Sequence, residues 1–330
     1  MTPPLARRRL LASGAALLAT SFVSRAGLAA DAYPSKPIKL TLGFAPGGIT
    51  DILARIVASH LASALKAHVI VDNRPGAGGN IAAAQVARAA PDGYSLLFGT
   101  LGTAVTNQFI YKDMPFDTAK DFAPVGLVGS VPNVLLVHRD VPATTVQEYI
   151  ALAKAKPGSL SYGSAGLGSS THLGMELFKT MTGIEVENVP YKGSALLLQD
   201  LLAGRIPSAM DSISIHLPHI RSGAIRALGV TSPTRAPDLP DVPTIAEVAV
   251  PGYDAVVWLY VSAPAGTPQP IVSRLSEAVV TGVRSADLQR QIREVGAVPL
   301  PGTADDLARH VAAETVKWKK IVDAAGLKPE

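Results

Sequence analysis

The clearest pattern of hydrophobic and polar positions lies in residues 38–65. Apolar side chains alternate with smaller or polar ones over residues 38–44, which predicts a strand with one buried face. A proline and two glycines in residues 45–48 then predict a sharp bend. Helical spacing follows as far as Leu65 and predicts an amphipathic helix, with Thr50 or Asp51 as its cap. Its apolar side comprises Ile52, Leu53, Ile56, Val57 and Leu61.

A glycine-rich bend that leads from a strand into a helix is suited to binding an anion. The first N–H groups of a helix have no partner within the helix, and the helix dipole places partial positive charge at the same end. A carboxylate or a phosphate can therefore be held there without a cationic side chain. The alternative is that the glycines only form a tight turn.

The same arrangement of strand, bend and helix recurs along the chain, which favours the anion site. The predicted strands are 69–71, 94–98, 160–162 and 186–190, and the bends that follow them are 72–80, 99–103, 163–170 and 191–194. Helices are expected at 81–90, around Leu173, Leu177 and Phe178, and at 195–203, where Ser194 is the expected N-cap.

The remaining pattern completes an α/β chain. Further strands are expected at 122–127, 134–137, 206–210, 224–230 and 256–263, and helices at 145–154 and 244–248. Two long amphipathic helices, 270–294 with an interruption and 304–325, are expected to close the chain without a further strand and to pack on the first domain. Alternating strands and helices predict mostly parallel sheets, in which ligands lie beyond the carboxyl ends of the strands.

Residues 1–30 are typical of an export signal peptide. Three arginines at 7–9 precede a short apolar stretch, and small residues at 29–32 offer the expected cleavage site. The arginines also resemble a twin-arginine signal. Without this segment, 30 Lys and Arg become 26, because four arginines are removed, and they balance the 26 Asp and Glu. The mature chain is therefore formally neutral, which gives no support to a nucleic-acid partner, and we expect it in the periplasm.

Enzyme, cofactor and metal chemistry have little support in the sequence. The chain has no cysteine. The order Gly163-Ser164-Ala165-Gly166 is not the Gly-x-Ser-x-Gly of a serine hydrolase, and residues 46–49 do not supply a dinucleotide fingerprint. His216 and His219 lack the neighbours of a zinc site. We therefore expect no catalytic residue, no metal and no cofactor.

Six segments in order resemble the substrate-binding proteins of tripartite tricarboxylate transporters, also called Bug-type receptors. They are YPSKPIKLTLGFAPGGITD, VDNRPGAGGNIAAAQVARAAPDGYSLLFGT, SYGSAGLGSSTHLGMELF, VPYKGSALLLQDLLAGRI, RAPDLPDVPTIAEV and WLYVSAPAGTP, and they span the mature chain. The chain departs from the family pattern at Leu196 and Gln108, where the family commonly has proline near these positions.

The resemblance implies the fold and the domain boundaries. It implies an α/β fold of the periplasmic-binding-protein type II architecture, with two hinged domains that close on a ligand cleft. Domain I would comprise residues 31–131 and 256–330, and domain II residues 132–255. Trp258 and Tyr260 would pack near the hinge.

The resemblance also implies the site and the partners. From domain I, the ligand would be held by Phe44, Ala45, Gly47, Gly48, Thr50, Asp51, Thr100, Gly102 and Thr103. From domain II, its variable part would be held by Ser164, Ala165, Gly166, Ser169, His172, Gly193, Ser194 and Asp211. The protein would be a monomeric, non-catalytic receptor that delivers a small organic carboxylate to a membrane permease. The carboxylate would be a dicarboxylate, a tricarboxylate, an acidic amino acid or an aromatic acid.

Several alternatives stay open at this point. Asp51 is favoured as a helix cap with a secondary ligand role. His172 could equally donate to the ligand or hold its own bend. For the whole protein, the alternatives are a periplasmic sensor that feeds a signalling partner and, more distantly, a doubly wound α/β enzyme.

Overall fold

The computed structural model describes residues 33–166, 169–191, 193–324 and 326. By its internal contacts the chain divides into two units, Met1–Ser35 and Lys36–Glu330. The predicted signal peptide, residues 1–30, lies outside the described residues. All of the elements below belong to the second unit.

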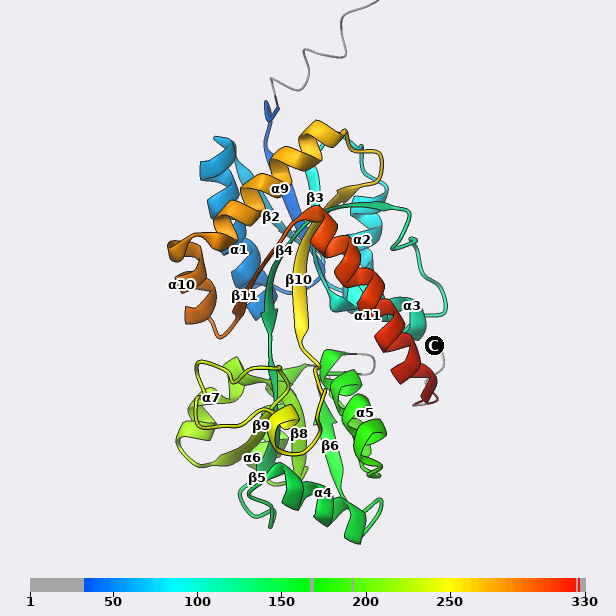
Figure 1. The fold of residues 1–330 in the computed structure, drawn as a ribbon, viewed down its shortest axis with the longest axis vertical. Helices are drawn as coiled ribbons and strands as arrows, with labels where there is room; N and C mark the ends of the chain where they lie inside the picture. The colour runs from blue at the N-terminus through cyan, green and yellow to red at the C-terminus, as the bar shows by residue number, and fades with distance from the viewer. Residues whose placement is uncertain (1–32, 167–168, 192, 325, 327–330) are drawn as a thin grey trace, which may run out of the picture. The chain divides into compact units, whose positions relative to one another are not determined.

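The second unit contains two separate sheets (Figure 1). The first has six strands in the order β11-β4-β10-β3-β1-β2. Its strands are β1 (Ile38–Leu42), β2 (Val69–Asn73), β3 (Ser95–Thr100), β4 (Phe122–Val131), β10 (Val257–Pro264) and β11 (Val298–Gly302). β1 pairs in parallel with β2 and β3, whereas β10 and β11 pair antiparallel with their neighbours. The carboxyl ends of β1, β2 and β3 therefore meet at one edge.

Helices cover both faces of the first sheet. They are α1 (Ile49–Leu65), α2 (Asn80–Ala87), α3 (Asn107–Ile110), α9 (Gln269–Arg284), α10 (Ala286–Glu294) and α11 (Ala304–Ala324), with a 3-10 turn η1 (Ala77–Gly79) and a π-helix η2 (Gly102–Thr106). α1, α9 and α10 lie together on one side, and α2, α3 and α11 lie on the other (Figure 1). Leu53, Val57 and Leu61 of α1 are buried as predicted, while Ile52 is 37% exposed.

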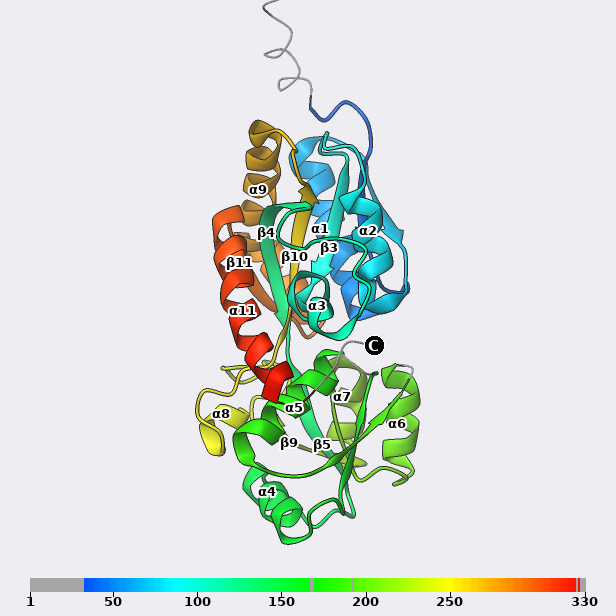
Figure 2. The same cartoon turned by 90° about the vertical axis from the view of Figure 1, so that its right-hand side faces the viewer.

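The second sheet has five strands in the order β7-β6-β8-β5-β9. They are β5 (Asn133–His138), β6 (Ser161–Ser164), β7 (Glu187–Pro190), β8 (Ser208–Ser212) and β9 (Ile225–Val230). Its helices are α4 (Val146–Ala155), α5 (Ser170–Thr182), α6 (Ser194–Leu202), α7 (Ile213–Arg221) and α8 (Ile245–Val248). β6 pairs in parallel with β7 and β8, so their carboxyl ends also share an edge. α4 and α5 lie over one face, and α6 and α7 over the other (Figure 2).

The chain crosses between the sheets twice. β4 leads into β5 through a single residue, and the chain returns to the first sheet just before β10. The start of β10 is fastened to α11, because the indole N–H of Trp258 donates to Oε2 of Glu314 over 3.3 Å. Within α11, the indole N–H of Trp318 donates to the same oxygen over 2.8 Å. Trp258 and Tyr260 are buried near this crossing, with ring centroids 5.6 Å apart.

Five features of the sequence prediction were wrong. The sheets are not mostly parallel, because four pairs of neighbouring described strands are parallel and five are antiparallel. A strand, β11, does lie between the closing helices, although α9 and α11 pack on the first sheet as expected. The expected loop at 99–103 is the end of β3 followed by the π-helix. Helix α7 was not predicted. The N-caps of α1 and α6 are Gly48 and Gly193, so Thr50, Asp51 and Ser194 lie inside the first turns rather than at the caps.

No helix in the described part of the chain is both long and apolar enough to span a membrane.

Candidate functional site

Three bends meet at the carboxyl edge of β1, β2 and β3. Gly43, after β1, and Gly79, before α2, touch through their backbones, because a Cβ on Gly43 would lie 2.2 Å from Cα of Gly79. A Cβ on Gly79 would in turn lie 2.8 Å from Cγ2 of Thr103 and 3.8 Å from Cε2 of Phe44. Glycine is therefore needed at both positions for the loops to approach this closely. The domain I residues expected from the sequence do lie together.

The bend before α1 presents exposed backbone. Ala45, Gly47 and Gly48 are exposed, and Phe44 is half-buried. The N-cap, Gly48, has no side-chain cap hydrogen bond. Because the first N–H groups of a helix have no partner within the helix, this end of α1 offers donors and partial positive charge to solvent. This geometry suits an anion such as a carboxylate.

Asp51 holds the bend in place rather than facing outward. It is 2% exposed, and its Oδ2 accepts hydrogen bonds from the N–H of Gly47 and from Nε of Arg55, over 2.9 and 3.0 Å. Its Oδ1 accepts from Nδ2 of Asn73, which also donates to the carbonyl of Phe44. The carboxylate thus ties the bend to the end of β2. Asn73 was not singled out from the sequence, although an asparagine directly after a strand is a residue type that commonly bonds to nearby backbone.

This network lowers the pKa of Asp51. Burial alone would raise the pKa, but the hydrogen bonds from Arg55, Gly47 and Asn73 outweigh it and favour the ionised form. A carboxyl with a lowered pKa adds stability that is complete above its unfolded pKa and is lost as the pH falls through the folded pKa.

We therefore predict that Asp51→Ala lowers the free energy of unfolding at pH 7 by about 2 kcal/mol, because buried donors are left unpaired. The difference from the wild type should begin to shrink as the pH falls below about 4, the ordinary pKa of an aspartate in the unfolded chain, and should shrink further as the pH falls through the lowered pKa of the folded protein. Chemical denaturation of both proteins across this pH range measures it. Asp113→Ala, which removes an exposed carboxylate elsewhere in the chain, is the control for a general charge effect. Equal stability of wild type and Asp51→Ala at pH 7 would contradict this role.

Thr100 and Thr103 are also engaged with the protein itself. The hydroxyl of Thr103 donates to the carbonyl of Thr100 and accepts from its N–H, both over 3.0 Å, and lies 3.2 Å from the hydroxyl of Tyr260. Both threonines are almost fully buried, and Gly102 between them is half-buried. Asn107 braces this turn by donating to Gly78 and Asn80, and it too was missed from the sequence. These side chains position the π-helix beside the first bend.

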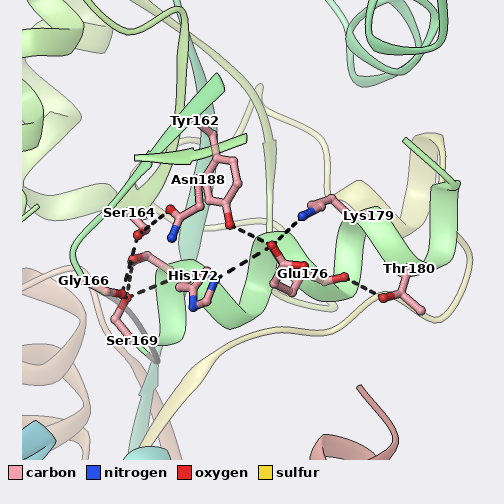
Figure 3. A network of polar contacts seen from close by, with 10 residues as sticks. Tyr162, Ser164, Gly166, Ser169, His172, Glu176, Lys179, Thr180 and Asn188 are labelled. Carbon is pink, nitrogen blue, oxygen red and sulfur yellow. Dashed lines mark hydrogen bonds and ion pairs between the residues drawn. The ribbon is translucent and has the colours of Figure 1, made fainter. Parts of the chain in front are cut away.

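A second group of bends lies at the carboxyl edge of β6, β7 and β8. The bend after β6 leads into α5, whose N-cap, Ser169, accepts from the N–H of His172 and donates to the carbonyl of Gly166 (Figure 3). Ser164 is fully buried and donates to Oδ1 of Asn188 over 2.8 Å. The N–H of Ala165 donates to Oγ1 of Thr171. Side chains therefore shape this bend from behind.

His172 and Glu176 form a buried polar pair on α5. Nε2 of His172 lies 3.8 Å from Oε1 of Glu176, which also accepts from the hydroxyl of Tyr162 and from Lys179 (Figure 3). Burial lowers the pKa of His172, although Glu176 opposes the shift, so the imidazole is neutral at pH 7. This geometry places His172 in the wall of the bend. Of the two roles considered from the sequence, donating to the ligand or holding its own bend, it agrees with the second.

The bend before α6 is backed by Asp211. Its Oδ1 accepts from the hydroxyl of Ser194 and from the N–H of Ser212, both over 2.8 Å. Asp211 is 1% exposed, so it can act on a ligand only through Ser194. Gly193 has a φ of +108° with open space around its Cβ position, and Tyr191 links this bend to the previous one by donating its N–H to the carbonyl of Ser164.

The domain II residues expected from the sequence thus form a second group. In each group the backbone of the bends is exposed or half-buried, and buried side chains support it from the protein interior. Among the described residues, no group of three or more His, Asp and Glu is arranged to hold a metal ion.

The chain matches the family model described as the tripartite tricarboxylate transporter family receptor, over residues 53–327. Three solved structures are similar. Rpa4515 from R. palustris with adipate is 43% identical, with a TM-score of 0.82, over 90% of this chain and 100% of that one. The periplasmic binding protein BugD is 33% identical, with a TM-score of 0.77, over 90% and 100%.

MatC from Rhodopseudomonas palustris with bound malate is 32% identical, with a TM-score of 0.76, over 88% of this chain and 100% of that one. The match covers both sheets, so the predicted α/β fold of periplasmic binding proteins is confirmed. The family and these structures are solute-binding receptors, not enzymes. The chain belongs to the tripartite tricarboxylate transporter receptor family.

Proposed function

We propose that this receptor captures a small organic carboxylate by hydrogen bonds from the backbone at the start of α1. The observation that carries the proposal is the exposed bend at Gly47 and Gly48. Gly48 is the N-cap of α1, and no side chain makes a capping hydrogen bond there. Hydrogen bonds from amides to an ionised acceptor are stronger than those between neutral groups. Two similar proteins have been solved with adipate and with malate, which are both carboxylates.

We assign the two sheets to two domains that close on the ligand. Domain I would comprise residues 31–131 and 256–330, and domain II residues 132–255. The division is supported by the strands, because each sheet takes its strands from one of these sets. A ligand that contacts the bends of both sheets would favour the closed state by its extra affinity for that state.

The remaining parts of the proposal concern location and delivery. The leader at residues 1–30 would export the chain to the periplasm, where one similar receptor, BugD, is placed by its name. There the loaded receptor, as a monomer, would deliver its ligand to the membrane permease of a tripartite transporter. Delivery is supported by the family description, which names a receptor of tripartite tricarboxylate transporters.

A thermal-shift screen of the mature protein tests the proposal. The screen compares dicarboxylates, tricarboxylates, acidic amino acids and aromatic acids with the amide of each. We expect at least one acid to raise the melting temperature in a saturable way, by several degrees at about 100 times its dissociation constant. The diamide of that acid should have no effect. Stabilisation by neutral compounds alone would overturn the proposal.

A further inference from the structure

Two buried polar atoms face each other behind the bend at α6. Oδ2 of Asp211 and Nε2 of His216 have no hydrogen-bond partner among the described residues. They lie 3.9 Å apart, and the two side chains are 1% and 0% exposed. A buried polar atom without a partner is costly, so this pair needs an explanation.

The other hydrogen bonds of the pair determine where its proton lies. Nδ1 of His216 lies 3.0 Å from the carbonyl of Ser212, which can only accept, so Nδ1 carries a hydrogen. In a neutral imidazole, Nε2 then carries a lone pair. Oδ1 of Asp211 already accepts two hydrogen bonds. One proton must therefore lie between Oδ2 and Nε2, since otherwise two electron-rich atoms would face each other in a dry site.

The surroundings favour the proton on the carboxyl. Burial raises the pKa of Asp211 to about 6 and lowers that of His216 to about 4. The described titratable side chains on α7 and on the elements packed around the pair are His138, Tyr162, His172, Glu176, Lys179, Asp200, His219, Arg221 and Arg226. Of the described residues, only His219 on the same helix adds a charge effect, which lowers the pKa of His216 further. No described cation compensates the carboxylate.

Asp211 fixes the direction of the hydrogen bond that it forms with Ser194. Ser194 has a single hydroxyl hydrogen, which it donates to Oδ1 of Asp211. Its oxygen can then only accept from any other group. Ser194 is half-buried in the first turn of α6, so its side chain offers lone pairs there, beside the backbone N–H groups of a helix end whose N-cap has no side-chain hydrogen bond.

We propose that Asp211 and His216 share one buried proton at mildly acidic pH, and that Asp211, by accepting the hydrogen of Ser194, leaves the Ser194 hydroxyl as a hydrogen-bond acceptor at the α6 end of the site. The ligand group that contacts Ser194 carries a hydrogen-bond donor, such as a hydroxyl, an amide N–H or a protonated carboxyl. This inference rests on the proposed function, because it describes the end of the ligand opposite the carboxylate held at α1. Asp211 and His216 are positioning residues in this scheme.

The proton pair is tested without a ligand. Between about pH 4 and 6 the wild-type pair holds one proton both folded, on Asp211, and unfolded, on His216, so the two pH effects on stability cancel. In Asp211→Asn, which can donate to Nε2, only His216 titrates, and stability should fall as the pH drops from about 6.5 towards 4. In His216→Leu only Asp211 titrates, and stability should fall as the pH rises from about 4 to 6.

Each slope should approach one proton, which is a tenfold change in the folding equilibrium per pH unit. His68→Gln, which removes an exposed histidine far along the chain from the pair, is the control and should behave as the wild type does. Unfolding measured across pH 4 to 7 gives these slopes. Equal slopes in all four proteins would overturn the shared proton. Opposite slopes in the two variants would support it.

The polarity of the ligand end is tested with one carbon chain. The probes are hexanoate, 6-hydroxyhexanoate, adipic acid monoamide and adipate, measured by calorimetry at pH 8, where Asp211 is ionised and still accepts the hydrogen of Ser194. The hydroxyl and the amide should each improve affinity over hexanoate by about two- to tenfold. Adipate, whose second carboxylate cannot donate at this pH, should bind no more tightly than the monoamide. Ser194→Ala should remove the advantage of the donor groups.

The outcomes separate this inference from the function on which it rests. If adipate binds more tightly than the monoamide at pH 8, and Ser194→Ala weakens adipate most, then Ser194 is a donor and the inference is wrong. If no carboxylate of any length binds, the proposed function is wrong. The claim that the ligand carries a hydrogen-bond donor at Ser194 is then wrong as well. The pH slopes of the unliganded variants still decide whether the proton is shared.

Discussion

Gly48→Val is expected to weaken carboxylate binding by at least about 100-fold, or about 3 kcal/mol, while the fold is retained. Gly48 has φ −79° and ψ 165°, which valine adopts readily. Only the carbonyl of Ala45, at 3.8 Å, lies within 4 Å of the position of its Cβ. The valine methyl groups would therefore project into open space at the start of α1. That space is where the anion must approach the backbone N–H groups.

Calorimetry with the acid identified in the thermal-shift screen measures this loss, and the melting temperature without ligand reports the fold. Gly48→Ala is the matched control and should reduce affinity much less, because one methyl group leaves room for the anion. Unchanged affinity in Gly48→Val would remove the α1 bend from the site.

Gly43→Ala is expected to have the largest effect on stability. Its Cβ would lie 2.2 Å from Cα of Gly79 and 3.0 Å from the carbonyl carbon and oxygen of that residue. All three are backbone atoms, so no rotamer change can relieve the clash. We expect a loss of about 3 kcal/mol in the free energy of unfolding, as for a strongly overpacked interior position.

Binding should weaken in the same variant, because the first two bends must move apart. Denaturant unfolding and calorimetry measure the two effects. Gly48→Ala again serves as control, since it adds the same methyl group to the same bend without a close contact. A stable Gly43→Ala with wild-type affinity would show that the contact between Gly43 and Gly79 is not needed.

The strands and helices in which hydrophobic residues recur with a regular period were predicted well from the sequence. The strand and the helix on either side of the first bend lie within a few residues of their predicted ends, because alternation and helical spacing both continue into buried positions there. The short helix α8 also begins as expected, with Thr244 and Glu247 forming a capping box.

The missed elements break local rules for a physical reason. Strand β11 contains Pro299 and Pro301, which usually argue against a strand, but β11 is an edge strand that pairs only with β4. Helix α7 carries Pro218, and its apolar residues Ile213, Ile215 and Leu217 alternate as in a strand, so no helical period is visible. The π-helix after β3 is rich in glycine and threonine, which is also typical of loops.

The positions of the backbone bends that form the site could be predicted from the sequence. The side-chain contacts that hold these bends could not. Glycine-rich bends marked the correct places, since glycine is what close approach requires. The partners that hold the bends come from distant positions. Asn73 reaches Asp51, Asn188 reaches Ser164, and His216 lies beside Asp211. A single sequence contains no pattern that pairs such residues. Asp211 was therefore expected at the ligand, and Asp51 at the helix cap with a secondary ligand role, rather than as buried supports of the bends.

The central claim is that backbone N–H groups at the start of α1 hold a carboxylate. The most direct measurement is an NMR titration of the ¹⁵N-labelled protein with the identified acid and, in parallel, with its amide. We predict that the amide protons of Gly48 and Ile49 shift downfield with the acid and stay in place with the amide, since a charged acceptor strengthens these hydrogen bonds. If the acid binds while both signals remain unchanged, the carboxylate is held elsewhere and the account is wrong.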